Sequence, residues 1–147
     1  MEKCMRPGFT VTKLDGSFPG RLRPEEPWRR SVPFSRITSE VSAFENWQPV
    51  LSGKWAFADH ITLGEGRAVV RLLEALAGCA RAHRHRVQNL EDNMAVSYAF
   101  EKGRSPAGPL NFLLRKRCAL CAATGIVLTL PWVETDRMPA DWASRQK

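Results

Sequence analysis

Apolar and polar residues alternate along this chain with two different periods, and each period predicts one kind of element. Between residues 65 and 77 the apolar positions recur at helical spacing, which predicts an amphipathic helix. Short apolar runs with Ile, Val, Leu and Thr, such as residues 126–130, predict buried strands. In chain order, the expected elements are a strand hairpin within 41–57, a helix at 65–77, a strand at 87–90, helices at 94–101 and 110–123, a strand at 126–130, and a short terminal helix that begins near Pro139.

Glycine and proline mark where these elements end and where the folded part begins. Gly78 and Gly125 each follow a predicted helix and can end it. Residues 1–38 are rich in Pro, Gly and Arg and show neither period, so we expect a poorly ordered N-terminal segment. Residues 39–147 are expected to fold as one domain around a single core. Strands that alternate with helices predict an α/β fold, a mixed sheet flanked by helices.

Composition narrows the class of protein without deciding its function. Hydrophobic residues make up 44% of the 147 residues and charged residues 25%, as in ordinary globular proteins. No apolar run approaches the roughly 20 residues that a membrane span needs, and the N-terminus lacks the apolar stretch of a signal peptide. The protein is therefore expected inside the cell, in the cytoplasm or nucleus. The formal charge of +7 weakly favours a polyanionic partner such as nucleic acid.

Two short motifs have ordinary structural explanations. Cys118 and Cys121 form a CxxC, but they continue the apolar face of a predicted helix. Buried structural thiols are therefore favoured over a redox or zinc site. His83 and His85 lie in a basic HRHR stretch and could bind a metal or transfer a proton, although a solvated basic loop is the simpler interpretation.

Three carboxylates occupy positions where the edge of a sheet could gather them. Glu65 lies on the apolar face of its helix, Asp92 directly follows a strand, and Asp141 lies in the first turn of the last helix. Each also has an ordinary interpretation: the helix dipole favours an acid in a first turn, and an Asp between strand and helix is often an N-cap. If the three converge, their oxygens suit hard divalent cations, a pair of which can serve phosphodiester hydrolysis.

The stretches that contain these acids resemble segments of one protein family. Residues 60–69, HITLGEGRAV, resemble the "HIN-x-x-E-x-x-A" segment of the ribonuclease H domain in tyrosine-recombinase retroelements of the DIRS and Ngaro type. Residues 90–95, LEDNMA, are similar to its "TDN-x-x-A" segment, and residues 139–145, PADWASR, to its closing "N-x-x-AD-x-x-SR" motif. Residues 102–111, KGRSPAGPLN, resemble the Gly-rich break and the helix that follows it. The resemblance covers about residues 45–145.

The resemblance implies a ribonuclease-H-like fold and metal-dependent hydrolysis of RNA in RNA–DNA hybrids during reverse transcription. Glu65, Asp92 and Asp141 would take the second, third and fourth acidic positions of the site and bind Mg²⁺ or Mn²⁺. The hybrid would be recognised through its backbone shape and its 2′-hydroxyls. The candidate nucleic-acid contacts are Asn93, Lys102 and Arg104.

The chain departs from the family pattern at the first acidic position. The family carries an Asp in a "TDAS" segment of its first strand, whereas residues 39–47 of this chain read SEVSAFENW. Glu40 is the candidate replacement, and Glu45 is a weaker one. Only 25 positions separate Glu40 from Glu65, so an incomplete first strand is expected. A Glu is also longer than an Asp and would displace a metal oxygen, so we expect weak or absent endonuclease activity.

Two other functions stay open at this point. A non-catalytic nucleic-acid-binding or scaffold module could keep the fold without the chemistry. A small basic protein unrelated to retroelements could carry the three motifs by chance. The distances between Glu65, Asp92 and Asp141 separate this last alternative from the first two.

Overall fold

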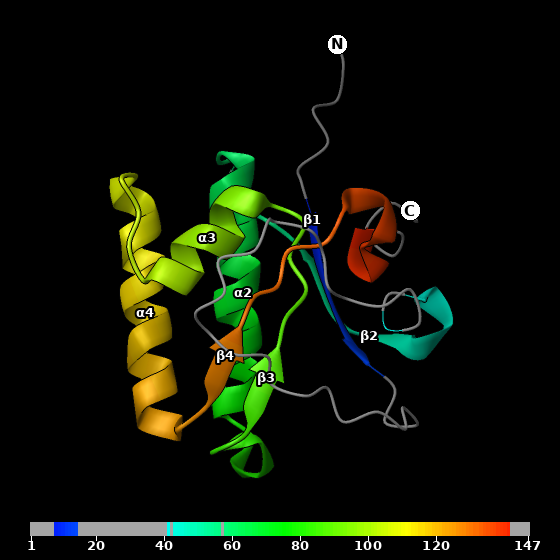
Figure 1. The fold of residues 1–147 in the computed structure, drawn as a ribbon, viewed down its shortest axis with the longest axis horizontal. Helices are drawn as coiled ribbons and strands as arrows, with labels where there is room; N and C mark the ends of the chain where they lie inside the picture. Colours follow the sequence, from blue (N-terminus) through cyan, green and yellow to red (C-terminus); the bar gives the residue numbers. More distant parts are fainter. Residues whose placement is uncertain (1–7, 15–40, 42, 57, 142–147) are drawn as a thin grey trace, which may run out of the picture.

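The structure, a computed structural model, describes residues 8–14, 41, 43–56 and 58–141, which form a mixed α/β arrangement (Figure 1). The α/β class expected from the alternation of strands and helices is therefore confirmed. The strands are β1 (Gly8–Leu14), β2 (Trp47–Lys54), β3 (Arg86–Gln88) and β4 (Val127–Thr129). The helices are α2 (Ile61–Ala77), α3 (Met94–Lys102) and α4 (Gly108–Thr124). Short 3₁₀ turns occupy Phe44–Asn46, Ala80–Ala82 and Thr135–Arg137, and a further helix begins at Pro139.

The first two strands form an antiparallel pair that the sequence did not predict. The expected hairpin within 41–57 is wrong, because β2 continues through Ser52 and Gly53 without turning. Its partner is β1, and the pairing starts with Gly8 opposite Lys54. β1 has the strand-forming sequence GFTVTKL, with three β-branched residues. A local reading misses the pair because its two strands are far apart in the sequence.

The segment 1–38, expected to be poorly ordered, therefore contains a strand at residues 8–14. The other residues of that segment lie outside the described ranges. Within the pair, the register shifts between Val11 and Thr12, close to Pro49 of β2. A proline has no N–H to donate to the ladder, so an irregularity at this point is expected.

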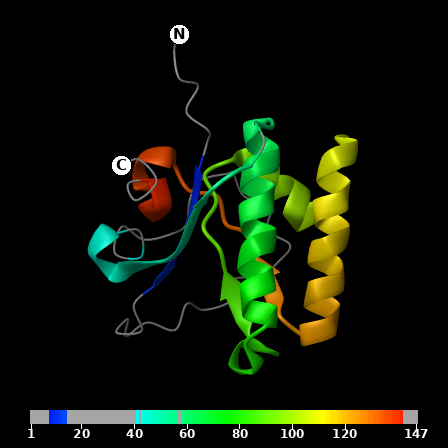
Figure 2. The same ribbon diagram turned by 180° about the vertical axis from the view of Figure 1, so that it is seen from behind.

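A parallel pair of strands lies at the centre of the arrangement. β3 and β4 align Arg86 with Val127, and the pairing continues past β3 as a bridge between Glu91 and Trp132. Parallel strands need a long crossover connection, which α3 and α4 supply here. α2 and α4 lie side by side, and α2 runs along the back of the β3–β4 pair in the view of Figure 1 (Figures 1 and 2).

Helix α2 begins four residues before the first residue that its apolar period predicts. His60 is its N-cap, and a ring nitrogen of His60 accepts a hydrogen bond from the backbone N–H of Thr62 (3.3 Å). Gly66 lies on the side of α2 that faces α4, where an added Cβ would lie 3.0 Å from Cδ1 of Leu110. The missing side chain therefore lets the two helices pack closely.

The hydrophobic core lies between the three helices and β4. Leu73 of α2 and Phe100 of α3 are completely buried, so they anchor the two helices to the same interior. Burial of such side chains supplies most of the favourable free energy of folding. The other core members are Val69, Val70, Val96, Ala99, Leu110, Leu114, Ile126, Leu128 and Leu130.

Two helices end at glycines in the left-handed conformation. Gly103 follows α3 with φ 70°, and Gly125 follows α4 with φ 69°, as the sequence predicts for Gly125. This conformation is cheap for glycine and costly for residues that carry a Cβ. A Cβ on Gly125 would in addition lie 3.2 Å from Cγ of Arg84.

Replacement of Gly125 by Ala should therefore destabilise the fold. We expect Gly125→Ala to lower the free energy of unfolding by about 1–2 kcal/mol, because of the left-handed backbone alone. Gly108→Ala is the matched control, since nothing lies within 4 Å of a Cβ built at that helix N-terminus. Urea denaturation of the two variants and the parent measures the difference. Equal midpoints for both variants would contradict a cost from the left-handed backbone at residue 125.

Candidate metal centre

Three carboxylates meet at the end of β3. Glu65 comes from the second turn of α2, and Glu91 and Asp92 follow β3 just before α3. One carboxylate oxygen from each lies within 4.8 Å of the oxygens of the other two, a spacing that could hold a metal ion. The sequence predicted Glu65 and Asp92 as ligands, and the structure brings these two together. Glu91 was not predicted.

Asp92 does not have the ordinary role of an N-cap. The cap of α3 is Asn93, whose side-chain oxygen accepts hydrogen bonds from the backbone N–H groups of Ala95 (3.0 Å) and Val96 (3.3 Å). The backbone carbonyl of Asp92 accepts a hydrogen bond from Nε1 of Trp132 (2.9 Å). A backbone contact therefore holds Asp92 in place, and helix capping does not explain why this position carries a carboxylate.

Glu65 also lacks the ordinary explanation that the sequence offers. It belongs to the second turn of α2, because the helix begins at Ile61, so a first-turn dipole effect does not apply. Its Oε2 atom is buried and has no hydrogen-bond partner among the described residues. A buried carboxylate oxygen without a partner is costly, and a bound cation would remove that cost.

Asn93 connects the three acids, a role different from the nucleic-acid contact expected for it. Its backbone N–H donates a hydrogen bond to Oε1 of Glu91 (3.3 Å), and its side chain hydrogen-bonds Glu65. Its side-chain amide also lies 3.4 Å from the hydroxyl of Thr62. These contacts orient the carboxylates from the last residue of the connection between β3 and α3.

Glu91 is the most buried of the acids, with 5% of its surface exposed. Its burial raises its pKa to about 8, and the nearby charge of Glu65 adds to the shift. Its backbone is fixed by the parallel pairing, since its N–H donates to the carbonyl of Pro131 (3.1 Å). The sequence reading missed Glu91 because the family segment "TDN" has Thr at this position, although an acid directly before Asp92 at a strand end was a usable signal.

The other two carboxylates share this environment. Burial raises the pKa of Glu65 and that of Asp92, and Asp141 raises the pKa of Asp92 further. No Lys or Arg of the described ranges forms an ion pair with Glu65, Glu91 or Asp92. The cluster therefore brings three acidic groups together without a basic side chain from the described ranges to neutralise them.

The remaining predicted acids have different positions. Asp141 lies in the first turn of the helix that begins at Pro139, close enough to Asp92 to interact electrostatically, but it is outside the group of three. Glu40 lies outside the described residues. Glu45 is exposed in the turn before β2 and is not part of the group.

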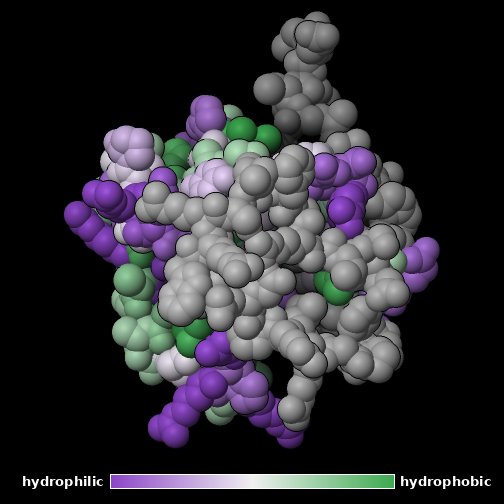
Figure 3. All heavy atoms as spheres, in the orientation of Figure 1, coloured by the Kyte–Doolittle hydropathy of each residue, from purple (hydrophilic) through white to green (hydrophobic). Residues whose placement is uncertain are grey.

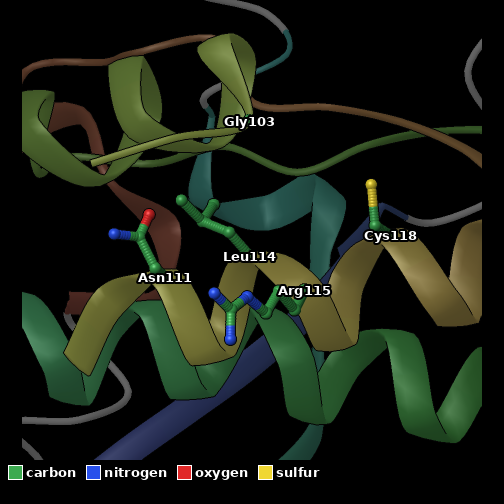
Figure 4. Close-up of a pocket in the computed structure, with 5 residues that line it drawn as sticks. All are labelled: Gly103, Asn111, Leu114, Arg115 and Cys118. Carbon is green, nitrogen blue, oxygen red and sulfur yellow. The ribbon is translucent and has the colours of Figure 1, made fainter. Parts of the chain in front are cut away.

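Lys102 and Arg104, the other expected nucleic-acid contacts, lie at the far end of α3 and are exposed. The ammonium group of Lys102 lies 5.8 Å from the ring centre of Tyr98. A small open hollow of about 180 Å³ lies between the C-terminal end of α3 and α4 (Figure 4). It is separated from the carboxylates by the length of α3. Its lining residues are Gly103, Asn111, Leu114, Arg115 and Cys118.

The CxxC cysteines are free thiols with different surroundings. Cys121 packs against the core, and burial raises the pKa of its thiol, which makes it a poor nucleophile. Cys118 is exposed, so the prediction that both thiols are buried is wrong for this residue. It faces outward because α4 exposes one side over most of its length.

No known protein family, curated protein or solved structure matches the chain. The function of the chain is therefore argued from the geometry of the site. Among the described helices, none has both the length and the apolar character needed to cross a bilayer.

The raised pKa of Glu91 predicts how stability depends on pH. Without divalent cations, the free energy of unfolding should fall as pH rises from 4.5 to about 8, because the folded state keeps a proton that the unfolded state has lost. One such proton gives a slope of up to about 1.4 kcal/mol per pH unit. Glu91→Gln should flatten this decline, and Glu101→Gln, an exposed control in α3, should not. Urea denaturation across the pH range tests it; parallel curves for Glu91→Gln and the parent would refute the assignment.

Proposed function

We propose that this chain is a metal-dependent phosphodiester hydrolase of the ribonuclease H type, which cleaves the RNA strand of RNA–DNA hybrids in retroelement reverse transcription. The observation that carries the proposal is the group formed by Glu65, Glu91 and Asp92, with one oxygen of each within 4.8 Å of the others. Mg²⁺ and Mn²⁺ are the expected cofactors, because these hard ions prefer carboxylate oxygens.

The residues fit a divalent cation in three respects. Oε2 of Glu65 is buried and finds no hydrogen-bond partner in the part of the chain that the structure describes, so it is available as a ligand. Burial raises the pKa values of all three carboxyl groups, and among the described residues no basic side chain pairs with them to lower these values. Asp92 and Glu91 are held by backbone contacts at the strand end, which limits their movement. A bound cation would activate water and stabilise the charge that develops on the phosphate.

The order of the elements also supports the proposal. Glu65 comes from the helix after the antiparallel strands, Asp92 from the end of the next strand, and Asp141 from the last helix. The resemblance to the retroelement ribonuclease H domain implies acids on these same elements, in this order. Asp141 is outside the group of three but interacts electrostatically with Asp92, so it would add a fourth acid on that side of the site.

Glu91 could replace the Asp that the family carries in its first strand and that residues 39–47 of this chain lack. It lies within the same group as Glu65 and Asp92, whereas the family pattern has no acid at this position. Glu91 also needs to lose a proton to bind a cation at neutral pH, because its pKa is about 8. This property favours a second function for the same fold, a nucleic-acid-binding module whose catalysis is weak or lost.

A cleavage assay tests the proposal directly. The protein should cut a labelled RNA–DNA hybrid in Mn²⁺ or Mg²⁺, and faster as pH rises toward 8 because Glu91 ionises. Glu65→Gln and Asp92→Asn should each lower the rate by about 10²-fold or more, since a lost ligand removes several kcal/mol of transition-state stabilisation. Glu101→Gln should leave the rate unchanged. Hybrid binding without metal-dependent cleavage by the parent protein would favour the non-catalytic module.

Metal binding can be measured without any nucleic acid. Mn²⁺ should raise the thermal unfolding midpoint in proportion to the logarithm of its concentration, because only the folded state gathers the ligands. Binding near neutral pH should release about one proton, which comes from Glu91. Calorimetry in two buffers of different ionisation enthalpy reports that proton, and Glu91→Gln should abolish its release. A midpoint that does not respond to Mn²⁺ would exclude the metal site.

A further inference from the structure

The turn between α2 and β3 carries a cluster of positive charge, at the opposite end of β3 from the carboxylates. Residues 78–90, GCARAHRHRVQNL, contain no acidic residue. Arg81, Arg84, His85 and Arg86 are exposed, and none of the three arginines forms an ion pair with a described residue. Hydrophilic residues gather along the lower edge of the space-filling view, where this turn lies (Figure 3).

Arg84 has a backbone conformation that does not suit its side chain. Its φ is 61°, and no other non-glycine residue in the described ranges has a positive φ. The left-handed region is costly for a residue with a Cβ, and glycine or asparagine occupies it more easily. Such a conformation persists only where the surroundings impose it, and it often marks a functional position.

The neighbouring chain holds Arg84 in this position. Its backbone N–H donates a hydrogen bond to the carbonyl of Thr124 (3.0 Å), and the N–H of Val127 donates to the carbonyl of His85 (3.0 Å). Gly125 faces Arg84, and a Cβ on it would lie 3.2 Å from Cγ of Arg84. The absence of a side chain at Gly125 therefore leaves room for the stem of Arg84, on a turn tied to both α4 and β4.

We propose that Arg81, Arg84 and Arg86, with His85 beside them, form a binding surface for the phosphate backbone of a polynucleotide. Guanidinium groups that are exposed and unpaired match phosphate oxygens in charge and in geometry. Arg86 and Glu91 are five positions apart along the chain, which spans roughly 17 Å at about 3.3 Å per residue if the chain is extended. Roughly five nucleotides of one strand span that distance at about 3.4 Å each. The inference thus deepens the proposed function: the turn would bind the hybrid away from the site of cleavage.

Basic residues near the C-terminal ends of α2 and α4 would also stabilise the helix dipoles. This structural role predicts that loss of the charge destabilises the fold. The binding role predicts something different for Arg84→Gly, because glycine relieves the positive φ while removing the guanidinium. We expect this variant to unfold at a higher midpoint than the parent and to bind nucleic acid more weakly.

Fluorescence anisotropy with a labelled RNA–DNA hybrid, without divalent cations and over a series of NaCl concentrations, tests the surface. Arg81→Gln/Arg84→Gly/Arg86→Gln should lower the affinity by about 10²-fold near 0.1 M salt and lower the salt slope by about three, one for each lost phosphate contact. The control Lys54→Gln/Arg115→Gln/Lys116→Gln removes three exposed charges elsewhere and should keep most of the affinity and slope.

Several results would overturn the proposal: no binding of the hybrid by the parent, equal losses in both triple variants, or tight binding to phosphatidylserine vesicles in place of the hybrid. Its failure is distinguishable from that of the proposed function. Asp92→Asn should lose cleavage and keep binding, whereas the basic-turn variant should lose binding. Normal binding by the basic-turn variant, with cleavage intact, would reject the surface alone. Binding that depends on the turn, in a protein that never cleaves, would support the surface and reject the hydrolase.

Discussion

Like charges that are buried together must be neutralised, and the arrangement at the end of β3 follows from that requirement. Glu65, Glu91 and Asp92 bring their oxygens within 4.8 Å of one another, and no described basic side chain pairs with them. Such a group either keeps protons or takes up a cation. The pKa of about 8 at Glu91 reflects the first state, and the unpartnered oxygen of Glu65 suits the second. Folding, protonation and metal binding are therefore linked through the same three side chains.

Backbone contacts, more than side-chain packing, hold these three mutually repelling carboxyl groups together. The parallel pairing of β3 with β4 continues to Glu91, so the strand ladder places that carboxyl. Asn93, the N-cap of α3, interacts with both Glu91 and Glu65, which joins the helix start to the cluster. Core packing against Leu73 and Phe100 then fixes α2 and α3 around the strand end. Contacts elsewhere in the fold thus offset the electrostatic repulsion among the three acids.

The two ends of β3 have opposite electrostatic character. The acids lie beside the N-terminus of α3, and the basic turn lies between the C-termini of α2 and α4. Helix dipoles favour negative charge at the first kind of end and positive charge at the second. The same backbone arrangement therefore supports both a cation site and a phosphate-binding surface, separated along one short strand. A polyanionic substrate could bind to the turn while its cleavable bond lies near the carboxylates.

The sequence by itself determined the order and kind of the helices and strands after β2, although α2 begins four residues earlier than its apolar period predicts. Helical spacing, strand-forming runs and the glycine after α4 are local signals that the core satisfies without conflict. It also identified Glu65 and Asp92, since each lies in a local motif on a predicted element. Only the tertiary structure decided the partner of β2, because that pairing joins strands far apart in the sequence. The same holds for the burial of Glu91 and for the left-handed backbone of the basic turn, although the sequence already indicated that this turn is basic. The burial of Glu91 depends on neighbours from α2 and from the strand after α4, and the left-handed Arg84 depends on Gly125; no local pattern carries such contacts.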